Sequence, residues 1–371
     1  MSEAEPAGET SGEENEGPAP RPTLWQEWSR PLLLLALTFL STFYVGAGAA
    51  RGSLLKHWPH LTMKWSGIDK AVDAMPRLFE SMGELEYYFA NPGDFLAGWT
   101  FAVPLMAILI AHEMGHYVAG RIHGVDISPP YFIPMPIFLL GTMGAVIRMR
   151  DRIETKDALL DIGAAGPLAG MVVALPVVIY GIAVSRVGTV QEFLPPSLIS
   201  MEGGVFVEGR GVLYLGLIHL LKGPLAEGQD VWLSPWALAG WAGLLVTMIN
   251  LIPIGQLDGG HVAYALFGKK QDTYSRRVHW ALPFVGGLVS LLYIIPSYME
   301  GQRGLAELSG EMFAGFHWVF WAFILVVLVR LSGAEHPPTG PEPLSPARKI
   351  VAIGTLVLFA LLFMPSWIYV P

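Results

Sequence analysis

Residues 101–116 read FAVPLMAILIAHEMGH, in which two histidines and a glutamate follow eleven residues without a charge. An ionisable side chain at membrane depth costs about 2.5–3.5 kcal/mol on insertion scales, so such residues are usually functional. His112 and His116 are four residues apart, and on a helix they share one face, where both imidazoles can bind one metal ion. An HExxH sequence on a helix predicts a zinc site in which Glu113 acts as the general base.

The composition is that of a membrane protein. Hydrophobic residues make up 53% of the 371 residues and charged residues only 15%, whereas soluble domains carry about 25% charged residues. The chain has no cysteine, which excludes disulfides, thiolate metal ligands and a cysteine nucleophile. It has no extended basic segment that would indicate binding to nucleic acid.

The N-terminal residues are acidic. Six glutamates lie between residues 3 and 16, among glycines and prolines. Such a segment stays disordered because it cannot bury enough apolar surface to offset the entropy of folding. We therefore expect a disordered acidic tail over residues 1–30, which resembles neither a secretory signal nor a transit peptide.

The hydropathy pattern predicts an all-α polytopic membrane protein with about seven transmembrane helices, because a span needs about 20 apolar residues. The predicted spans are residues 31–50, 98–121, 159–185, 235–257, 279–298, 312–332 and 350–369. Residues 51–97 form an extramembrane or interfacial segment, residues 98–298 a membrane core, and residues 299–371 the C-terminal helices. The apolar run at 212–221 is too short to span and predicts an interfacial or re-entrant helix. Basic residues in the short loops favour a cytoplasmic N-terminus, and they put HEMGH toward the cytoplasmic end of its span.

Residues 125–150 do not fit a helix. Four prolines lie between residues 129 and 136, and the sequence from Gly144 to Arg150 alternates between two faces, as a strand does. Non-helical backbone at membrane depth survives only when it is buried in protein or lines a wet cavity. A loop or hairpin near HEMGH would meet that condition, and an ordinary interfacial loop explains the segment equally well.

A catalytic zinc usually has three protein ligands and one open position. Asp258 is the candidate for the third ligand, in the run MINLIPIGQLDGGH at 248–261. Pro253 cannot donate a helix hydrogen bond, so the helix should break and leave the carbonyl of Ile249 free. Broken helices at membrane depth often form ion-binding sites. Asn250 and Asp258 lie on either side of the break predicted at Pro253. Alternatively, Asp258 and the two glycines after it form a turn that ends a helix at the membrane surface.

HEMGH together with Asn250-x-x-Pro253-x-x-x-Leu257-Asp258-Gly259 resembles the two signatures of the site-2 proteases, a family of intramembrane zinc metalloproteases. The run from 249 to 261 is most similar to the plant and cyanobacterial branch that lacks a PDZ domain. The sequence GAAGPLAG at 163–170 resembles the Gly-Pro motif of the family's third core helix. The similarity covers residues 98 to 298. Many relatives have Asn at the position of Gly170, so we assign that position no polar role.

The resemblance implies one zinc ion per chain, held by His112, His116 and Asp258, with Glu113 catalytic. It also implies that residues 125–150 form a membrane-inserted β-hairpin whose edge, near Gly144 and Val146, binds an extended substrate. Asn250 and Pro253 would help to hold the substrate or the oxyanion.

The expected substrate is a transmembrane protein, with a single-span helix cut near the cytoplasmic side of a lipid bilayer. The expected location is a bacterial cytoplasmic membrane. The sequence predicts no oligomeric state.

A membrane transporter or metal carrier is the alternative function. A broken helix with ionisable groups near the midplane is typical of transporters, but this alternative gives no reason for Glu113 between the two histidines. A scaffold without activity is disfavoured, because all four site residues are present. We expect His123 and His261 to be solvated beyond helix ends, and we assign no role to His219 or His317.

Overall fold

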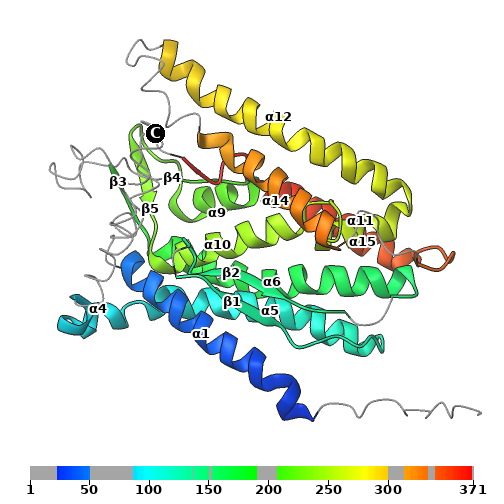
Figure 1. The fold of residues 1–371 in the computed structure, drawn as a ribbon. Helices are drawn as coiled ribbons and strands as arrows, with labels where there is room; N and C mark the ends of the chain where they lie inside the picture. Colours follow the sequence, from blue (N-terminus) through cyan, green and yellow to red (C-terminus); the bar gives the residue numbers. More distant parts are fainter. Residues whose placement is uncertain are drawn as a thin grey trace, which may run out of the picture.

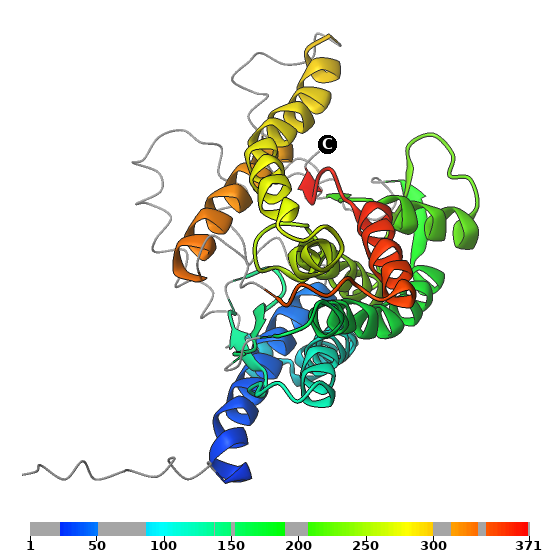
Figure 2. The ribbon, with the colours of Figure 1, turned by 90° about the vertical axis from the view of Figure 1, so that its right-hand side faces the viewer.

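The computed structural model describes residues 23–50, 87–136, 138–149, 153–189, 207–299, 313–332 and 339–369. Most of these residues are helical (Figures 1 and 2). The helices are α1 (Leu24–Ala50), α4 (Pro92–Leu96), α5 (Trp99–Ile122), α6 (Lys156–Val184), α9 (Val212–Lys222), α10 (Pro235–Asn250), α11 (Asp258–Phe267), α12 (Lys270–Met299), α14 (Phe316–Ser332) and α15 (Pro346–Leu362), with a 3₁₀ turn η1 at Phe313–Gly315. The strands are β1 (Tyr131–Pro134), β2 (Thr142–Val146), β3 (Arg186–Thr189), β4 (Val207–Glu208), β5 (Gln229–Trp232) and β6 (Ile368–Tyr369).

Within the described residues, four helical segments are long and apolar enough to cross a membrane: Leu24–Ala50, Pro92–Ile122, Lys156–Val184 and Lys270–Pro296. The chain is therefore a polytopic membrane protein by length and composition. Helices α10, α14 and α15 fall within or near the other three predicted spans, but they have only 16, 17 and 17 residues. A straight span needs about 20 residues, so the total of seven spans stays a prediction.

Helix α1 begins at Leu24, so residues 24–30, expected in the disordered tail, are helical. The reason is a capping box, in which the backbone N–H of Thr23 donates to Gln26 Oε1 at 2.9 Å and that of Gln26 donates to Thr23 Oγ1 at 3.4 Å. The rest of the predicted tail, and residues 51–86 of the predicted extramembrane segment, lie outside the described residues.

Helices α5, α6 and α10 pack together as the centre of the bundle (Figure 1). Without a strong hydrophobic drive between helices in lipid, close packing depends on small residues at the interfaces. Gly240 on α10 faces α6 so closely that a Cβ there would lie 2.6 Å from the Cα of Val178. Gly243 on α10 approaches α5 in the same way, next to Ile108.

The predicted span at 235–257 is broken, as Pro253 indicates. Helix α10 ends at Asn250, a turn over 251–257 follows, and α11 starts at Asp258. Gly255 has a φ of 53°, which glycine adopts without strain. The carbonyl of Ile249 is not left free as expected, because the backbone N–H of Ile252 donates to it at 3.2 Å.

Residues 131–146 form a two-stranded antiparallel hairpin, β1–β2, in which Tyr131 pairs with Val146 and Phe132 with Ala145. The strand predicted from Gly144 to Arg150 starts earlier, at Thr142, and ends at Val146, while Met149 makes one isolated bridge with Ile127. Arg150 lies outside the described residues. The hairpin packs mainly against α1. Its insertion into the membrane stays a prediction.

Two further strand pairs, β3–β5 and β4–β6, were not expected from the sequence. They lie at the end of the bundle where α10 begins (Figure 1). The short apolar run at 212–221 forms α9, which matches the predicted short helix.

Because Gly240 permits the contact between α6 and α10, Gly240→Ala should lower the stability of the folded protein by about 1–3 kcal/mol, the usual cost of overpacking. Thermal unfolding in detergent measures the change. Gly354→Ala on α15 is the matched control, since a Cβ there meets nothing within 4 Å. It should leave stability unchanged or raise it by up to about 1 kcal/mol. Equal unfolding midpoints for the two variants would contradict the packing argument.

Candidate metal centre

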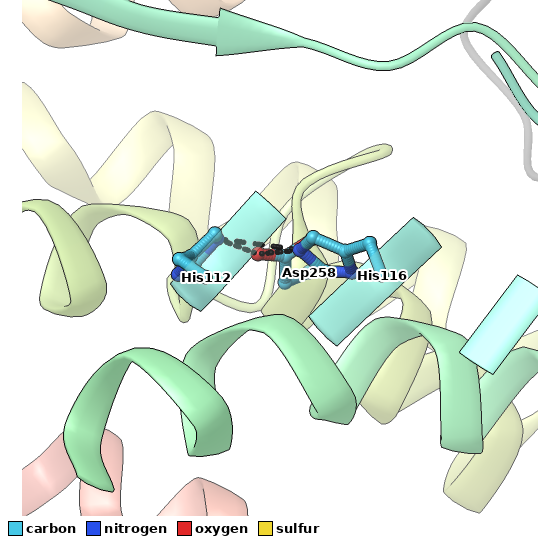
Figure 3. A group of neighbouring side chains, drawn as sticks. All are labelled: His112, His116 and Asp258. Atoms are coloured by element: carbon cyan, nitrogen blue, oxygen red, sulfur yellow. Dashed lines mark hydrogen bonds and ion pairs between the residues drawn. The ribbon is translucent and has the colours of Figure 1, made fainter. Parts of the chain in front are cut away.

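His112, His116 and Asp258 converge on one point from two helices (Figure 3). The Nε2 atom of each histidine lies 3.2 Å from Oδ2 of Asp258, and the two Nε2 atoms lie 3.2 Å apart. Both histidines are buried, and the Asp258 side chain is 16% exposed. Within the described ranges, this is the only cluster of three or more His, Asp or Glu side chains close enough to hold one metal ion.

The hydrogen bond of His116 determines which ring nitrogen is available to a metal. Nδ1 of His116 lies 2.7 Å from the carbonyl oxygen of Ile162. A carbonyl only accepts, so Nδ1 carries the hydrogen and donates it, and the lone pair of Nε2 faces His112 and Asp258. Ligating histidines typically have this arrangement, in which an outer acceptor fixes the tautomer and the ring orientation.

The donor set fits zinc. Two imidazole nitrogens and one carboxylate oxygen are a common set of protein ligands in catalytic zinc sites, which leave a fourth position open. A carboxylate this close to two histidines also needs a cation or protons to balance its charge, because burial of an unpaired charge is costly.

Helix α6 provides the space for the ligands because it carries small residues where it faces α5. A Cβ on Gly166 would overlap the imidazole of His116, and one on Gly115 of α5 would overlap the backbone carbonyl of Ala165. Gly170 lies beside His112, where a Cβ would be 3.2 Å from the Cβ of His112. This contact of Gly166 with His116 was not predicted, although the spacing of glycines in 163–170 indicates a close contact between helices.

Two glycines after Asp258 fix the start of α11. A Cβ on Gly259 would overlap the carbonyl of Leu251, and one on Gly260 would overlap the carbonyl of Gly255. The first turn of α11 can therefore pack directly onto the turn that follows α10. This contact sets the position of Asp258, the first residue of the helix.

Glu113 and Asn250 border the cluster. Glu113 is half-buried, and its carboxylate is close enough to His112, His116 and Asp258 to interact electrostatically with all three. The side-chain amide nitrogen of Asn250 lies 3.2 Å from Nε2 of His112. Glu113 and Asn250 thus lie beside the three metal-binding side chains, where a water molecule or substrate bound to the metal would react.

The other candidate substrate-binding residues are not in the cluster. Pro253 lines a cavity of about 330 Å³ between α11, α12 and α15, and its carbonyl accepts a hydrogen bond from Gln271 at 3.5 Å. Gly144 and Val146 are in β2, and in the described part of the chain no hydrogen bond connects them to the metal ligands.

Two histidines differ from expectation. His123, expected to be solvated, caps α5 and pairs with Asp161 at 2.8 Å. His261 is buried at 8% exposure inside α11 and packs against Gly163. His123 does follow the end of α5, so only its solvation was predicted wrongly, whereas His261 lies inside a helix. The sequence does not show that α6 packs beside both histidines. His219 is exposed on α9, and His317 lies against the rings of Trp318 and Trp367.

Residues 100–293, just over half of the chain, match the sequence model of peptidase family M50. The chain belongs to this family. The match confirms the resemblance to the site-2 proteases, and it includes the HEMGH sequence and Asp258. Helices α14 and α15 lie outside the matched residues of this M50 chain.

Several similar proteins are named as probable chloroplastic zinc metalloproteases of plants. EGY2 of Arabidopsis thaliana is 31% identical over 68% of this chain and 38% of its own length. EGY2 of Oryza sativa subsp. indica is 31% identical over 70% of this chain and 41% of its own length. EGY1 of Arabidopsis thaliana is 30% identical over 74% of this chain and 47% of its own length. The M50 chain thus spans less than half the length of each of these relatives. No solved structure matches it significantly.

Since the His116 ring occupies the space of a side chain at position 166, Gly166→Ala should displace the ring. We expect it to weaken metal binding by about 10–100-fold, as loss of correct ligand orientation usually does. Metal retained after dialysis, measured by elemental analysis, tests this. Gly216→Ala on α9 is the matched control, because a Cβ there would meet nothing within 4 Å. Equal metal retention in the two variants would contradict the argument.

Proposed function

We propose that this chain is a membrane-embedded zinc metallopeptidase that hydrolyses peptide bonds of transmembrane proteins. The observation that carries the proposal is the convergence of His112, His116 and Asp258 beside Glu113, inside an apolar helical bundle. Membership of peptidase family M50 and the names of the plant relatives support it.

In the proposed reaction, zinc held by His112, His116 and Asp258 would lower the pKa of water toward about 7 and polarise the scissile carbonyl. Glu113 accepts the proton of the attacking water and later delivers it to the leaving amine, which its position beside all three ligands allows. The Asn250 amide donates a hydrogen bond to the negative charge that develops on the carbonyl oxygen.

The proposed substrate is a single-span helix that becomes extended before it is cut. The peptide bonds of a helix are shielded by their own hydrogen bonds, so attack requires local unwinding. The β1–β2 hairpin is a two-stranded sheet, to which an extended peptide can add as a third strand. We propose that the edge near Gly144 and Val146 receives the peptide and that Pro253 keeps the neighbouring turn open for it.

The proposed cut is near the cytoplasmic side of a bacterial cytoplasmic membrane, with the N-terminus inside. His116 lies six residues before the end of α5 at Ile122, roughly 9 Å along the helix axis. Arg121 at this end agrees with a cytoplasmic position. The chloroplast location belongs to the names of the plant relatives, and we do not transfer it to this chain.

A metal carrier or transporter is the second candidate, because α10 is broken next to the ligand cluster. Glu113→Gln separates the two functions. The variant should bind zinc as the unaltered protein does, since it keeps all three ligands, while cleavage of a reconstituted single-span substrate falls by about 10²–10⁴-fold.

The matched control is Glu227→Gln, which removes an exposed carboxylate far along the sequence from the ligands. It should leave both zinc binding and cleavage unchanged. Full cleavage by Glu113→Gln would reject the proposed role of Glu113, and zinc transport without cleavage by the unaltered protein would favour the carrier.

The proposed binding of substrate to the edge of the β1–β2 hairpin can be tested at Gly144. Gly144 has a φ of 91°, which L side chains rarely adopt, while a Cβ there would meet nothing within 4 Å. Gly144→Val should therefore distort the edge of the hairpin without a clash, and raise KM by about tenfold with little change in zinc content. Steady-state kinetics measure KM and kcat. Gly223→Val, with a φ of 74° and the same open surroundings, controls for backbone strain alone, and an equal rise in its KM would argue against the hairpin as the binding edge.

A further inference from the structure

A cluster of charged side chains joins three helices at the end of the bundle where α5 ends and α6 and α15 begin (Figures 1 and 2). Arg348 of α15 holds Asp161 of α6 with two hydrogen bonds, Nε to Oδ1 at 2.8 Å and Nη2 to Oδ2 at 2.6 Å. Its Nη1 donates to Asp157 at 3.0 Å. His123, the C-cap of α5, contacts the same Asp161 at 2.8 Å.

Asp161 is the neighbour of a residue that contacts the metal ligands. The next residue, Ile162, accepts the hydrogen bond of His116 Nδ1 at 2.7 Å. Asp161 also ties α6 to the end of α5, through His123, seven residues after His116 on the same helix. Asp161 therefore makes one of the contacts between α6 and the end of α5, and it is adjacent to the residue that binds the His116 ring.

Helix α15 also rests on the helix that carries the third ligand. Ala352 and Leu344 of this C-terminal region pack in one apolar cluster with Leu160 of α6 and with Val262 and Ala265 of α11. Helix α15 therefore contacts α11, which begins at the ligand Asp258, and α6, whose Ile162 carbonyl binds His116. Arg348 makes the polar part of this contact, and it lies outside the residues that match family M50.

We propose that Arg348 is a positioning residue for the metal centre. It holds Asp161, and through the adjacent peptide it keeps the Ile162 carbonyl where that carbonyl orients the His116 ring. The inference rests on the proposed zinc site, but not on peptide cleavage. It gives the C-terminal helix a function in the site to which it contributes no ligand.

A merely structural cluster would give a different result. The Arg348 and Asp161 side chains are 35% and 29% exposed, and exposed ion pairs contribute little to stability. If the cluster only stabilised the fold, its loss would lower the unfolding temperature slightly and leave metal affinity unchanged. A positioning role instead changes metal affinity and the geometry of the bound ion.

The test compares zinc affinity and cobalt spectra among variants of the full chain. Zn²⁺ affinity is measured by competition with a chromophoric chelator, and the visible absorption of Co²⁺ reports the ligand geometry. Arg348→Gln and Asp161→Asn should each weaken Zn²⁺ binding by about tenfold, the lower end for loss of an outer partner of a ligating histidine. The double variant should lose little more than either single one, because both act through one contact.

Arg348→Lys should restore part of the affinity, since it keeps the charge but not the bidentate geometry. It also serves as the comparison if Arg348→Gln does not fold. Arg210→Gln is the matched control, because Arg210 also pairs with two carboxylates, Glu208 through Nε and Asp230 through Nη2, between β4 and α9 at the other end of the bundle (Figure 1). It should lower the unfolding temperature and leave Zn²⁺ affinity and the Co²⁺ spectrum unchanged.

Full Zn²⁺ affinity in Arg348→Gln, or an equal loss in Arg210→Gln, would overturn the inference while the proposed function stands. If the unaltered protein binds no Zn²⁺, the proposed function fails together with the inference. Weakened binding confined to Arg348→Gln and Asp161→Asn, with a changed Co²⁺ spectrum, supports it.

Discussion

The structure depends on the meeting of one carboxylate with two imidazoles inside an apolar bundle. Oδ2 of Asp258 lies 3.2 Å from Nε2 of both His112 and His116, although Asp258 comes from a different helix. Polar groups removed from water need partners, so the bundle must bring α11 and α5 to this distance. Helix α10 therefore ends at Asn250, and the following turn lets α11 start at Asp258, at the depth of the histidines. His112 Nε2 lies 3.2 Å from both Nδ2 of Asn250 and Oδ2 of Asp258, so the two helix ends that flank this turn meet at the same imidazole.

Helix α6 connects this cluster to the rest of the molecule. It packs against α5, α10, α11 and α15, and different parts of it serve different contacts. Gly166 and the Ile162 carbonyl receive His116, Val178 receives Gly240 of α10, and Asp161 binds Arg348 of α15. Small residues thus serve both the close packing that a membrane bundle needs and the space that the ligands need.

The proposed chemistry requires water at a site surrounded by apolar helices. The Asp258 side chain keeps 16% exposure and Glu113 is half-buried, so the cluster is not sealed from its surroundings. The histidines are buried while Asp258 and Glu113 are partly exposed, and we propose that water and substrate reach the ligands past these two carboxylates. In this arrangement the fixed ligands, the proposed base and the amide of Asn250 surround one small volume. A peptide must be brought there in extended form, which is the function we propose for the hairpin.

Local patterns in the sequence determined much of this site. The i, i+4 spacing of His112 and His116 puts both on one helix face, Pro253 disfavours a helix through the residues before it, and alternation after Gly144 indicates a strand. These features depend only on neighbouring residues, so they could be predicted. Only the tertiary structure decided that the Ile162 carbonyl holds His116, that Gly166 makes room for its ring, and that Arg348 reaches Asp161. Those contacts join residues 46 to 187 positions apart, and no local pattern encodes which distant segments pack together.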